Sequence, residues 1–512
     1  MLATVMGAVL VGLDAHPVRV EVHASRNVPS FELVGLAEAS VRESRVRVKS
    51  ALAQVGVDTS ECRIVVNLAP ADLRKNGSGF DLAIAVATLA ALRVLPEHVA
   101  GDMLLLGELS LDGAVRPVRG VLPHLLGARR RGVKVAIVPE ANAREAGLVR
   151  GISVRTVASL AELVGALRGE AELPRAPEVS PARITLAHHD LAEVKGQATA
   201  RRALEVAASG GHNVLFVGPP GAGKTMLARR LPGILPALTH EEAVEVTAIH
   251  SLAMPLGLER VAEERPFRAP HHTVNKIELM GDSDMPRPGE MSLAHHGVLF
   301  LDELSEFRRA AVEALRQPLE DGVVTVSRAQ GKATFPARPI VVGATNPCPC
   351  GHLGDGTGRC RCTPERVRAY RARLSGPLLD RLDVHVVLPP VPVEELGRAG
   401  GGEASALVRA RVEVARGVQT ARYEAGEVTA PRNGELPLSD LERVAAPDDA
   451  GARLLSMAIG KLNLSARAYG KVLRVARTVA DLDGATAVRS PHVAEAIAAR
   501  ALDRGPTPPH GA

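Results

Sequence analysis

The sequence has no tryptophan, and aromatic residues make up only 2% of its 512 positions. Proteins that recognise bases by stacking need aromatic platforms, so this scarcity argues against such a mechanism. No apolar run approaches the roughly 20 residues that cross a bilayer. The segment 1–20 also lacks the basic region and the cleavage site of a secretory signal. We therefore expect a cytoplasmic protein with no membrane partner.

Cysteine is scarce as well, and four of the five cysteines lie within residues 348–362. This clustering does not fit a disulfide framework in a cytosolic chain of this length. The 62 basic and 57 acidic residues leave a net charge of +5, too small an excess to indicate a nucleic-acid partner by itself. Only nine of the basic residues are lysines, so each lysine is informative, whereas the many arginines carry little weight.

What the chain does have is the composition of a folded protein, with 46% hydrophobic and 23% charged residues. Its length predicts about three domains. Alternating β-branched and helical patterns predict an α/β domain over 1–172, and prolines mark a linker over 173–188. Strands separated by helical patterns predict a parallel, doubly wound sheet over 189–400. A helical domain is expected over 401–505 and a disordered tail over 506–512.

A complete P-loop follows the apolar segment 213–217 and opens a helical pattern. It reads Gly218, Pro219, Pro220, Gly221, Ala222, Gly223, Lys224, Thr225. Glycines let backbone amides surround phosphates, Lys224 reaches the outer phosphates, and the Thr225 hydroxyl ligates magnesium. The alternative is an accidental glycine-rich turn. The context of strand and helix favours a nucleotide site.

Two adjacent carboxylates follow an apolar segment, as in the sites of proteins that hydrolyse nucleotides. The apolar segment 297–301 runs directly into Asp302 and Glu303. A fully apolar strand belongs at the centre of a sheet, which places Asp302 to hold magnesium and Glu303 to polarise the attacking water. The alternative is the acidic start of a helix after a core strand. Asn346 ends the next apolar strand, where its amide can bond the water or the terminal phosphate.

Longer phrases across the chain carry a family resemblance. They are RPFRAPHH at 265–272, PGEMSLAHHG at 288–297, LRQPLEDG at 315–322, ATNPCPCG at 344–351 and SGPLLDRLD at 375–383. With the P-loop, they resemble the magnesium-chelatase-like AAA+ ATPases of the YifB and competence protein ComM family. Segments 31–52 and 66–85 resemble that family's N-terminal Lon-protease-like α/β domain, and 463–482 resembles its C-terminal helical lid.

The resemblance implies a homo-hexameric ring that binds ATP and magnesium between subunits. It makes Asn346 the sensor of the terminal phosphate, Arg381 the arginine finger that reaches a neighbour's ATP, and Arg467 the sensor arginine of the lid. A planar guanidinium suits these roles because the transition state spreads negative charge over the phosphoryl oxygens. An ordinary salt bridge is the alternative for either arginine.

The long interval between Lys224 and Asp302 suggests an insertion over 265–288. Segment 323–334 reads as a β-hairpin. In the family that the sequence resembles, such elements line the pore, which would place Arg328 and Lys332 against DNA phosphates. The alternative is an edge hairpin with solvated charges. One departure is segment 281–284, which stands where the resemblance leads us to expect a glycine-rich stretch.

Cys348, Cys350, Cys360 and Cys362 form two C-x-C pairs on a glycine-rich loop. Four thiolates can close a tetrahedral zinc site, although one intervening residue is tighter than the usual two to four. Free thiols in a reducing compartment are the alternative. His352 is a candidate substitute ligand. A catalytic metal is not expected, because four cysteines leave no position for water.

The N-terminal domain lacks the residues of a Lon-type dyad, in which a lysine activates a serine. Ser78 is displaced from the nucleophile position, which falls on Gly79, and Leu122 stands at the lysine position. We therefore interpret the domain as non-catalytic, serving assembly or DNA entry. The triplet 129–131 of arginines is as well explained by helix capping as by phosphate contact.

The functional expectation drawn from the resemblance is an ATP-driven ring motor on single-stranded or branched DNA. It would act as a helicase that promotes branch migration in recombination during natural transformation. Two alternatives stay open: a chaperone subunit of magnesium-chelatase type that remodels a metal-inserting partner, and an ATP-dependent Lon-like protease. The sequence shows no porphyrin-binding features that would support the chaperone subunit. It also lacks the serine and lysine dyad that a Lon-like protease requires.

Overall fold

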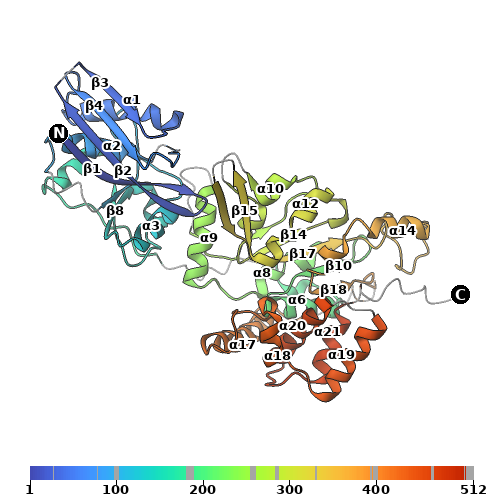
Figure 1. The fold of residues 1–512 in the computed structure, drawn as a ribbon. Helices are drawn as coiled ribbons and strands as arrows, with labels where there is room; N and C mark the ends of the chain where they lie inside the picture. The colour runs from blue at the N-terminus through green and yellow to red at the C-terminus, as the bar shows by residue number, and fades with distance from the viewer. Residues whose placement is uncertain are drawn as a thin grey trace.

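The computed structural model describes residues 1–26, 28–75, 77, 79–96, 103–179, 189–253, 261–282, 287–328, 331–392, 395, 402–462, 466–500 and 502. Within them the chain forms an N-terminal α/β unit, a central α/β unit and a C-terminal helical unit (Figure 1). No helix in this part of the chain combines the length and the apolar character needed to span a bilayer. The predicted tail at 506–512 lies outside the described residues.

The N-terminal unit is built on a seven-stranded sheet in the order β3-β4-β2-β1-β5-β8-β9. Its long strands β1 (Leu2–Val11) and β2 (Asp14–Ser25) form an antiparallel hairpin in which mostly alternate residues are buried, as one-sided packing requires. The other strands are β3 (Ser30–Val34), β4 (Arg63–Ala69), β5 (Met103–Leu105), β8 (Val135–Pro139) and β9 (Ser153–Val157), with a small pair β6 (Glu108–Leu109) and β7 (Val115–Arg116). Its helices are α1 (Ala39–Gln54), α2 (Asp81–Ala91), α3 (Val121–Arg130), α4 (Ala143–Ala146) and α5 (Leu160–Leu167).

The first half of the predicted linker packs on this unit. The Thr156 N–H donates to the carbonyl of Pro174 at 2.9 Å, and the Ala176 N–H donates to the carbonyl of Val154 at 3.0 Å. Proline removes a donor but keeps its carbonyl acceptor, so this segment can extend the sheet edge beside β9. Residues 173–179 therefore belong to the N-terminal unit, and 180–188 lie outside the described residues.

The central unit contains the predicted parallel sheet, with five strands in the order β11-β14-β17-β10-β18. They are β10 (Val214–Val217), β11 (Phe267–Arg268), β14 (Val298–Leu301), β17 (Ile340–Thr345) and β18 (Val384–Val387), and every pairing is parallel. The three inner strands are wholly buried, which is why their sequences read as continuous apolar runs. All five carboxyl ends consequently meet at one edge of the sheet.

Helices and two small β-pairs surround this sheet. The helices are α6 (Ala198–Gly210), α7 (Lys224–Ala228), α8 (Leu231–Ile234), α9 (His240–Ala253), α10 (Lys276–Met280), α11 (Glu290–Leu293), α12 (Arg309–Ala314), α13 (Pro318–Asp321), α14 (Pro364–Arg371) and α15 (Gly376–Leu379). The pairs are β12 (Gly281–Asp282) with β13 (Arg287–Pro288), and β15 (Val323–Arg328) with β16 (Gly331–Pro336). The second pair is the predicted hairpin.

The C-terminal unit consists of α17 (Ser405–Glu424), α18 (Leu438–Val444), α19 (Asp449–Leu462), α20 (Ala466–Leu482) and α21 (Ser490–Ala498). The apolar positions Val472, Val475 and Val479 of α20 are buried in one hydrophobic cluster that also includes α6 of the central unit. Because this cluster spans both units, the helical unit is packed on the sheet and not tethered loosely to it.

The N-terminal unit also docks on the central unit, at two places. The turn between β1 and β2 lies against β16, where Gly12 approaches the backbone of Thr334. At the second place Ser251 of α9 accepts the N–H of Gly120 at 3.0 Å and donates to the carboxylate of Glu145. Figure 1 shows α9 and β15 at this junction, facing the blue N-terminal sheet.

Candidate nucleotide site

The P-loop connects the end of β10 to the start of α7, at the carboxyl edge of the central sheet. Gly221 and Gly223 have φ values of +79° and +88°, the left-handed region that a residue with a Cβ adopts only at a cost. These two glycines let the loop turn sharply before the helix begins. A glycine-rich turn followed directly by the start of a helix is an arrangement whose backbone amides can bind phosphate.

The Lys224 amine is held in this space by three acceptors. It donates to the carbonyls of Gly218 at 2.6 Å and Pro219 at 3.0 Å, and to Asn346 Oδ1 at 3.0 Å. Burial lowers the pKa of Lys224, and the nearby charges of Asp302 and Glu303 oppose that shift. The structure thus brings the predicted sensor Asn346 and the P-loop lysine into direct contact.

The two predicted magnesium ligands also meet. The Thr225 hydroxyl donates to Asp302 Oδ2 at 2.8 Å. Asp302 directly follows β14, which is separated from the P-loop strand β10 only by β17. A hydroxyl and a carboxylate are hard oxygen donors of the kind Mg²⁺ prefers, so the donor set fits a magnesium ion that also contacts phosphate.

Glu303 follows Asp302 with a left-handed backbone, at φ 53°, and its N–H donates to Asp302 Oδ1 at 3.0 Å. The two adjacent carboxylates consequently have different partners: Asp302 contacts Thr225, and Glu303 lies beside His272. Glu303 Oε2 lies 3.4 Å from Nδ1 of His272. In the sequence, His272 is distinguished only as the last residue of RPFRAPHH, one of the segments that carry the family resemblance. The signal that points to it is the pairing of β11 with β14, which brings the segment after β11 to the same edge.

Arg381 and Arg467 lie elsewhere. Both line one hollow of about 790 Å³, together with Asn213, Pro339 and Asp383. These last three residues precede or begin β10, β17 and β18, so the hollow is at the amino edge of the sheet, opposite the P-loop. Strands of four residues separate the two edges by about 13 Å. Neither arginine is brought together with the P-loop of its own chain.

Within the chain, Arg381 is buried and bonded. Its guanidinium donates to the carbonyls of Arg316 at 2.9 Å and Pro377 at 2.6 Å, and it forms an ion pair with Glu320 at 2.5 Å. Glu320 is half exposed, so the pair borders the hollow and is open to exchange with another anion. Arg467 is exposed.

The hairpin of β15 and β16 pairs in register from Val323 with Pro336 to Arg328 with Gly331. Lys332 is exposed near its end. The side chain of Arg328 and the turn 329–330 lie outside the described part. In Figure 1 the hairpin lies next to α9, on the side of the central unit that faces the N-terminal unit.

The four clustered cysteines come together as predicted. Sγ of Cys348 lies 3.4 Å from that of Cys350 and 3.8 Å from that of Cys360, and all four sulfurs lie within 4.8 Å of one another. A bond from the His352 backbone N–H lowers the pKa of Cys350 to about 6, whereas the neighbouring cysteines raise the pKa of Cys360 and Cys362. The His352 ring is bonded instead to Asp355 at 2.9 Å. The donor set fits zinc through the cysteines alone.

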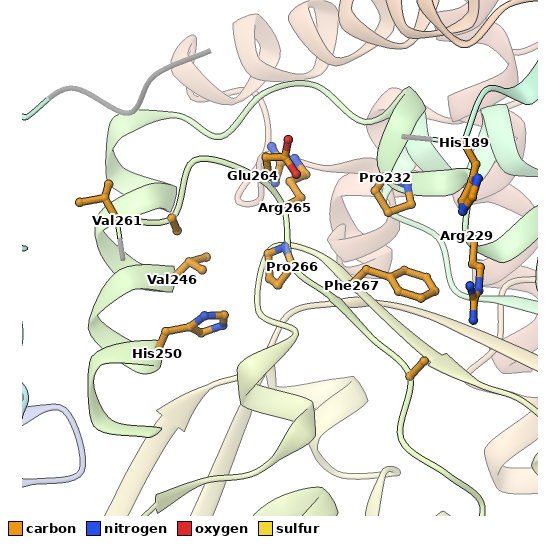
Figure 2. A pocket seen from close by; sticks show the side chains of 12 residues that line it. His189, Arg229, Pro232, Val246, His250, Val261, Glu264, Arg265, Pro266 and Phe267 are labelled. Carbon is orange, nitrogen blue, oxygen red and sulfur yellow. The ribbon is translucent and has the colours of Figure 1, made fainter. Parts of the chain in front are cut away.

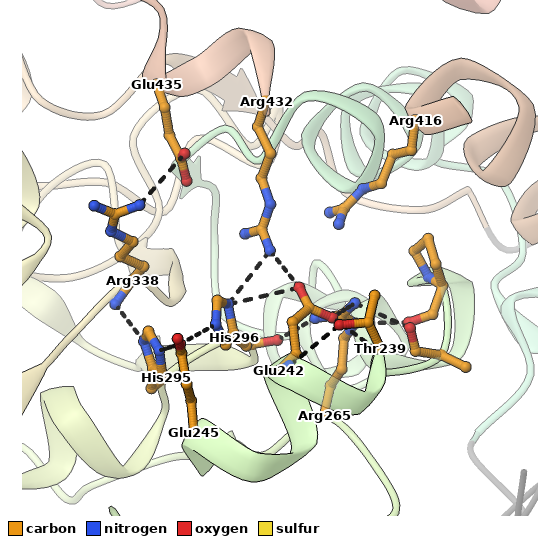
Figure 3. A network of polar contacts seen from close by, with 12 residues as sticks. Thr239, Glu242, Glu245, Arg265, His295, His296, Arg338, Arg416, Arg432 and Glu435 are labelled. Carbon is orange, nitrogen blue, oxygen red and sulfur yellow. Dashed lines mark hydrogen bonds and ion pairs between the residues drawn. The ribbon is translucent and has the colours of Figure 1, made fainter. Parts of the chain in front are cut away.

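A second cluster of metal-ligand residue types is Glu245, His295 and His296 (Figure 3). Nε2 of each histidine lies 2.9 Å from Glu245 Oε2. His295 Nδ1 accepts the backbone N–H of Arg338 at 3.0 Å, so its proton sits on Nε2 and is donated to Glu245. In this structure the cluster is a polar network, in which both Nε2 atoms are directed at the Glu245 carboxylate.

That network reaches into the helical unit. Arg432 and Arg265 both donate to the carboxylate of Glu242, each at 2.7 Å. Burial raises the pKa of Glu242, but the two guanidinium groups outweigh it and bring the value to about 2. As Figure 3 shows, Arg432 extends from the helical unit down to Glu242 on α9. Charged pairs therefore fix the position of the helical unit relative to α9.

A separate cavity of about 600 Å³ lies between α8, α9 and the segment around β11 (Figure 2). Phe267, Val246 and His250 line it together with Arg229. None of the predicted site residues contributes to it, and His250 is bonded to the Leu293 carbonyl at 2.8 Å. The cavity is not part of the P-loop site.

In the described part of the N-terminal unit, the positions that correspond to the serine and lysine of a Lon-type protease do not form a catalytic dyad. Leu122 is fully buried, and its N–H donates to Glu145 at 2.8 Å. Gly79 faces Val118, and Lys75 is buried with its amine on the Pro70 carbonyl. Ser78 lies outside the described residues. The same carboxylate, Glu145, receives Ser251 of α9, so the central unit packs where the lysine position falls.

Comparisons with known proteins cover nearly all of the chain. Residues 190–396 match the family model "Magnesium chelatase, subunit ChlI", residues 20–142 match "Subunit ChlI of Mg-chelatase", and residues 402–500 match "Magnesium chelatase, subunit ChlI C-terminal". Competence protein ComM of Haemophilus influenzae is 43% identical over 508 residues, 98% of each chain. YifB of Escherichia coli is 42% identical over 494 residues, 96% of each. A Lon protease of Mycolicibacterium smegmatis is 26% identical over 173 residues, 31% of this chain and 22% of its own.

Proposed function

The chain belongs to the ComM and YifB family of magnesium-chelatase-like proteins, and on that premise we propose that it is an ATP-hydrolysing hexameric motor that acts on DNA. The observation that carries the proposal is the P-loop site. Lys224 contacts Asn346, Thr225 contacts Asp302, and Glu303 stands beside them at one edge of the sheet. This set contains each group that phosphoryl transfer to water requires from one protein chain.

Each residue has a task in this reaction. The P-loop amides and Lys224 would bind the phosphates, and Asn346 would orient the terminal one. Mg²⁺, held by Thr225 and Asp302, would neutralise charge on the phosphate oxygens when bound. Glu303 would accept a proton from the water that attacks the terminal phosphorus. Lys224 would exchange its carbonyl partners for phosphate oxygens.

The position of the arginines supports an oligomer. Arg381 and Arg467 share a hollow at the amino edge of the sheet, out of reach of the P-loop in the same chain. A neighbouring subunit whose P-loop edge faces this hollow would present its triphosphate to both guanidinium groups. The triphosphate would then compete with the exposed carboxylate of Glu320 for Arg381. We infer that hydrolysis is completed between subunits of a homo-hexamer.

DNA is proposed as the substrate on two grounds. A relative that is 43% identical over 98% of this chain is named a competence protein, and this name suggests a DNA-related role. The hairpin of β15 and β16 presents Lys332 to solvent. By its resemblance to pore hairpins, it would contact the phosphates of single-stranded or branched DNA through Lys332 and Arg328. Helicase action in branch migration is the specific activity that we propose.

The test is ATP turnover by the full chain with and without forked DNA. Turnover should rise with DNA, and Lys332→Ala should lose most of that rise while the exposed control Lys134→Ala keeps it. Lys224→Ala should lose nucleotide affinity, whereas Glu303→Gln should bind ATP and turn it over about 100-fold more slowly. Turnover that is indifferent to DNA would favour the remodelling alternative, and ATP-dependent cleavage of casein would favour a protease.

A further inference from the structure

Glu303 is poorly fixed by its own surroundings. Its backbone is left-handed, at φ 53°, and 54% of its side chain is exposed. A general base must hold its carboxylate toward one water, and a displacement of about 1 Å can lower a rate about 100-fold. An exposed glutamate has several rotamers of similar energy. Some other group therefore has to select the productive one.

The group that lies in position to do so is the imidazole of His272. Its Nδ1 is 3.4 Å from Glu303 Oε2, and 34% of its side chain is exposed, so it borders the site. The ring of His271 lies beside it with a centroid distance of 4.1 Å. His271 is in turn bonded to Thr273 through Nδ1 at 2.9 Å. The imidazole of His272 is therefore supported on one side.

The segment that carries His272 is anchored at both ends. At its start, Arg268 forms a two-bond ion pair with Glu290, at 2.7 and 2.6 Å. At its end, Asn275 caps α10, and its N–H is accepted by Glu278 in a reciprocal capping box. Pro270 restricts the backbone between the two anchors. These constraints lower the entropy lost when the histidine holds a carboxylate.

The strand order explains why this segment reaches the site. β11 is the neighbour of β14, with Phe267 opposite Val298 in a parallel pair. The residues that follow β11 therefore emerge at the carboxyl edge, beside the residues that follow β14. His272 lies between α7 and β14, within the segment 265–288 that the sequence analysis predicted to be an insertion.

We propose that His272 is a positioning residue that holds the Glu303 carboxylate through Nδ1–H and thereby directs its other oxygen to the attacking water. In the step itself, the water oxygen bonds to the terminal phosphorus as the bond to the bridging oxygen breaks, and the water proton passes to Glu303 Oε1. His272 stays beside Oε2 and takes no part in the proton transfer. The proposal rests on the proposed ATPase function.

The experiment compares four full-length variants: His272→Ala, His272→Asn, Glu303→Gln and the double variant His272→Ala with Glu303→Gln. Nucleotide affinity is measured with a fluorescent ATP analogue, melting temperature checks folding, and steady-state turnover gives kcat and KM. His23→Ala, which alters an exposed histidine on β2 of the N-terminal unit, is the matched control. Asparagine is the informative replacement, because its Nδ2–H₂ can donate from about the same place as imidazole Nδ1–H.

We expect His272→Ala to keep nucleotide affinity and KM and to lose about 10- to 100-fold in kcat. His272→Asn should recover most of that loss, which a merely structural role would not explain. In the double variant the histidine change should add nothing to Glu303→Gln, because the two residues act as one unit. His23→Ala should match the wild type.

Two results would overturn the assignment while leaving the ATPase intact. One is wild-type kcat in a folded His272→Ala protein, and the other is an additive loss in the double variant. A wild-type protein that binds ATP but never hydrolyses it would instead refute the proposed function. The two failures are thus distinguishable in the same set of measurements.

Discussion

Burial of the His295 ring determines how this single side chain responds to pH. Nδ1 of its ring accepts the backbone N–H of Arg338, so a proton added there would face another N–H. Burial first, and then the neighbouring His296 and Arg432, lower its pKa from 6.5 to about 4, against the attraction of Glu245. The folded protein therefore holds this histidine neutral at a pH where the unfolded chain protonates it.

This gives a stability prediction with a definite sign. Between the unfolded pKa of 6.5 and the folded pKa of about 4, the unfolded state binds more protons, so stability falls as the pH decreases through that window. Going from pH 7.5 to 5.5 should cost about 1 kcal/mol from His295. Thermal melts of the wild type and His295→Gln should show a shallower pH dependence in the variant. An identical dependence would contradict the assignment of the ring.

For single residues, the sequence predicted those candidate site residues that directly follow a recognisable strand in the chain. The P-loop, Asp302 and Glu303 adjoin strands whose apolar runs are visible in the sequence, and the structure brings them to one edge. His272, by contrast, precedes Glu303 by 31 residues in the chain, and its relevance depends on the pairing of β11 with β14. Single-sequence patterns do not specify which strands are neighbours, so this contact was missed.

At the scale of elements, the cysteine loop is tied to the P-loop. Gly351 has φ +81°, and a Cβ there would lie 2.7 Å from Cδ of Pro220. Asn346, which bonds Lys224, is two residues before the buried Cys348. A metal that fixed the four sulfurs would therefore also restrain the segment that carries Asn346.

We predict that the loop binds one zinc ion per chain and that Cys348→Ser loses it. The variant should also bind ATP less tightly, because the loop that contacts Pro220 would no longer be held. Metal analysis of the purified proteins and fluorescent-nucleotide titration measure the two effects. Cys62→Ser is the control, since Cys62 lies outside the cluster and should not alter the zinc content. Purified wild type without zinc would leave free thiols as the interpretation.

The elements themselves were largely predictable because their apolar periodicity reflects one-sided or complete burial. The predicted hairpin and the strands that flank the P-loop are examples. The linker was not predicted correctly at its start, where residues 173–179 pack beside β9. Proline was taken there as a sign of a free segment, although its carbonyl still bonds a neighbouring strand.

At the scale of the whole molecule, the N-terminal unit contacts the hairpin that the sequence analysis connected with DNA, and it also contacts α9. Its β1–β2 turn lies on β16, and its Glu145 receives Ser251 at the end of α9, which leads into the insertion. Such docking surfaces are formed by residues that are distant in the chain, and no local pattern reveals them. We infer that this unit supports the hairpin and α9 and has no catalytic task of its own.

A matched pair of glycines tests this docking. Gly12 has φ +65°, and a Cβ there would meet the backbone of Thr334 at 3.2 Å, whereas Gly132 has φ +78° and open space around it. Alanine at either position costs about 1 kcal/mol from backbone strain. Gly12→Ala should cost measurably more in denaturant unfolding, and amide exchange in β16 should accelerate only in that variant. Equal costs at the two positions would mean that the contact does not stabilise the protein.

The central claim is that ATP bound by one subunit is hydrolysed with arginines from the next. Lys224→Ala and Arg381→Ala should each be nearly inactive alone, the first without nucleotide affinity and the second with it. The most direct measurement is the ATPase rate of their mixture, reassembled from dissociated subunits. A mixed ring contains interfaces with an intact P-loop on one side and an intact Arg381 on the other, so the account predicts substantial recovery of activity. A mixture no more active than its components, in rings shown to be mixed, would contradict it.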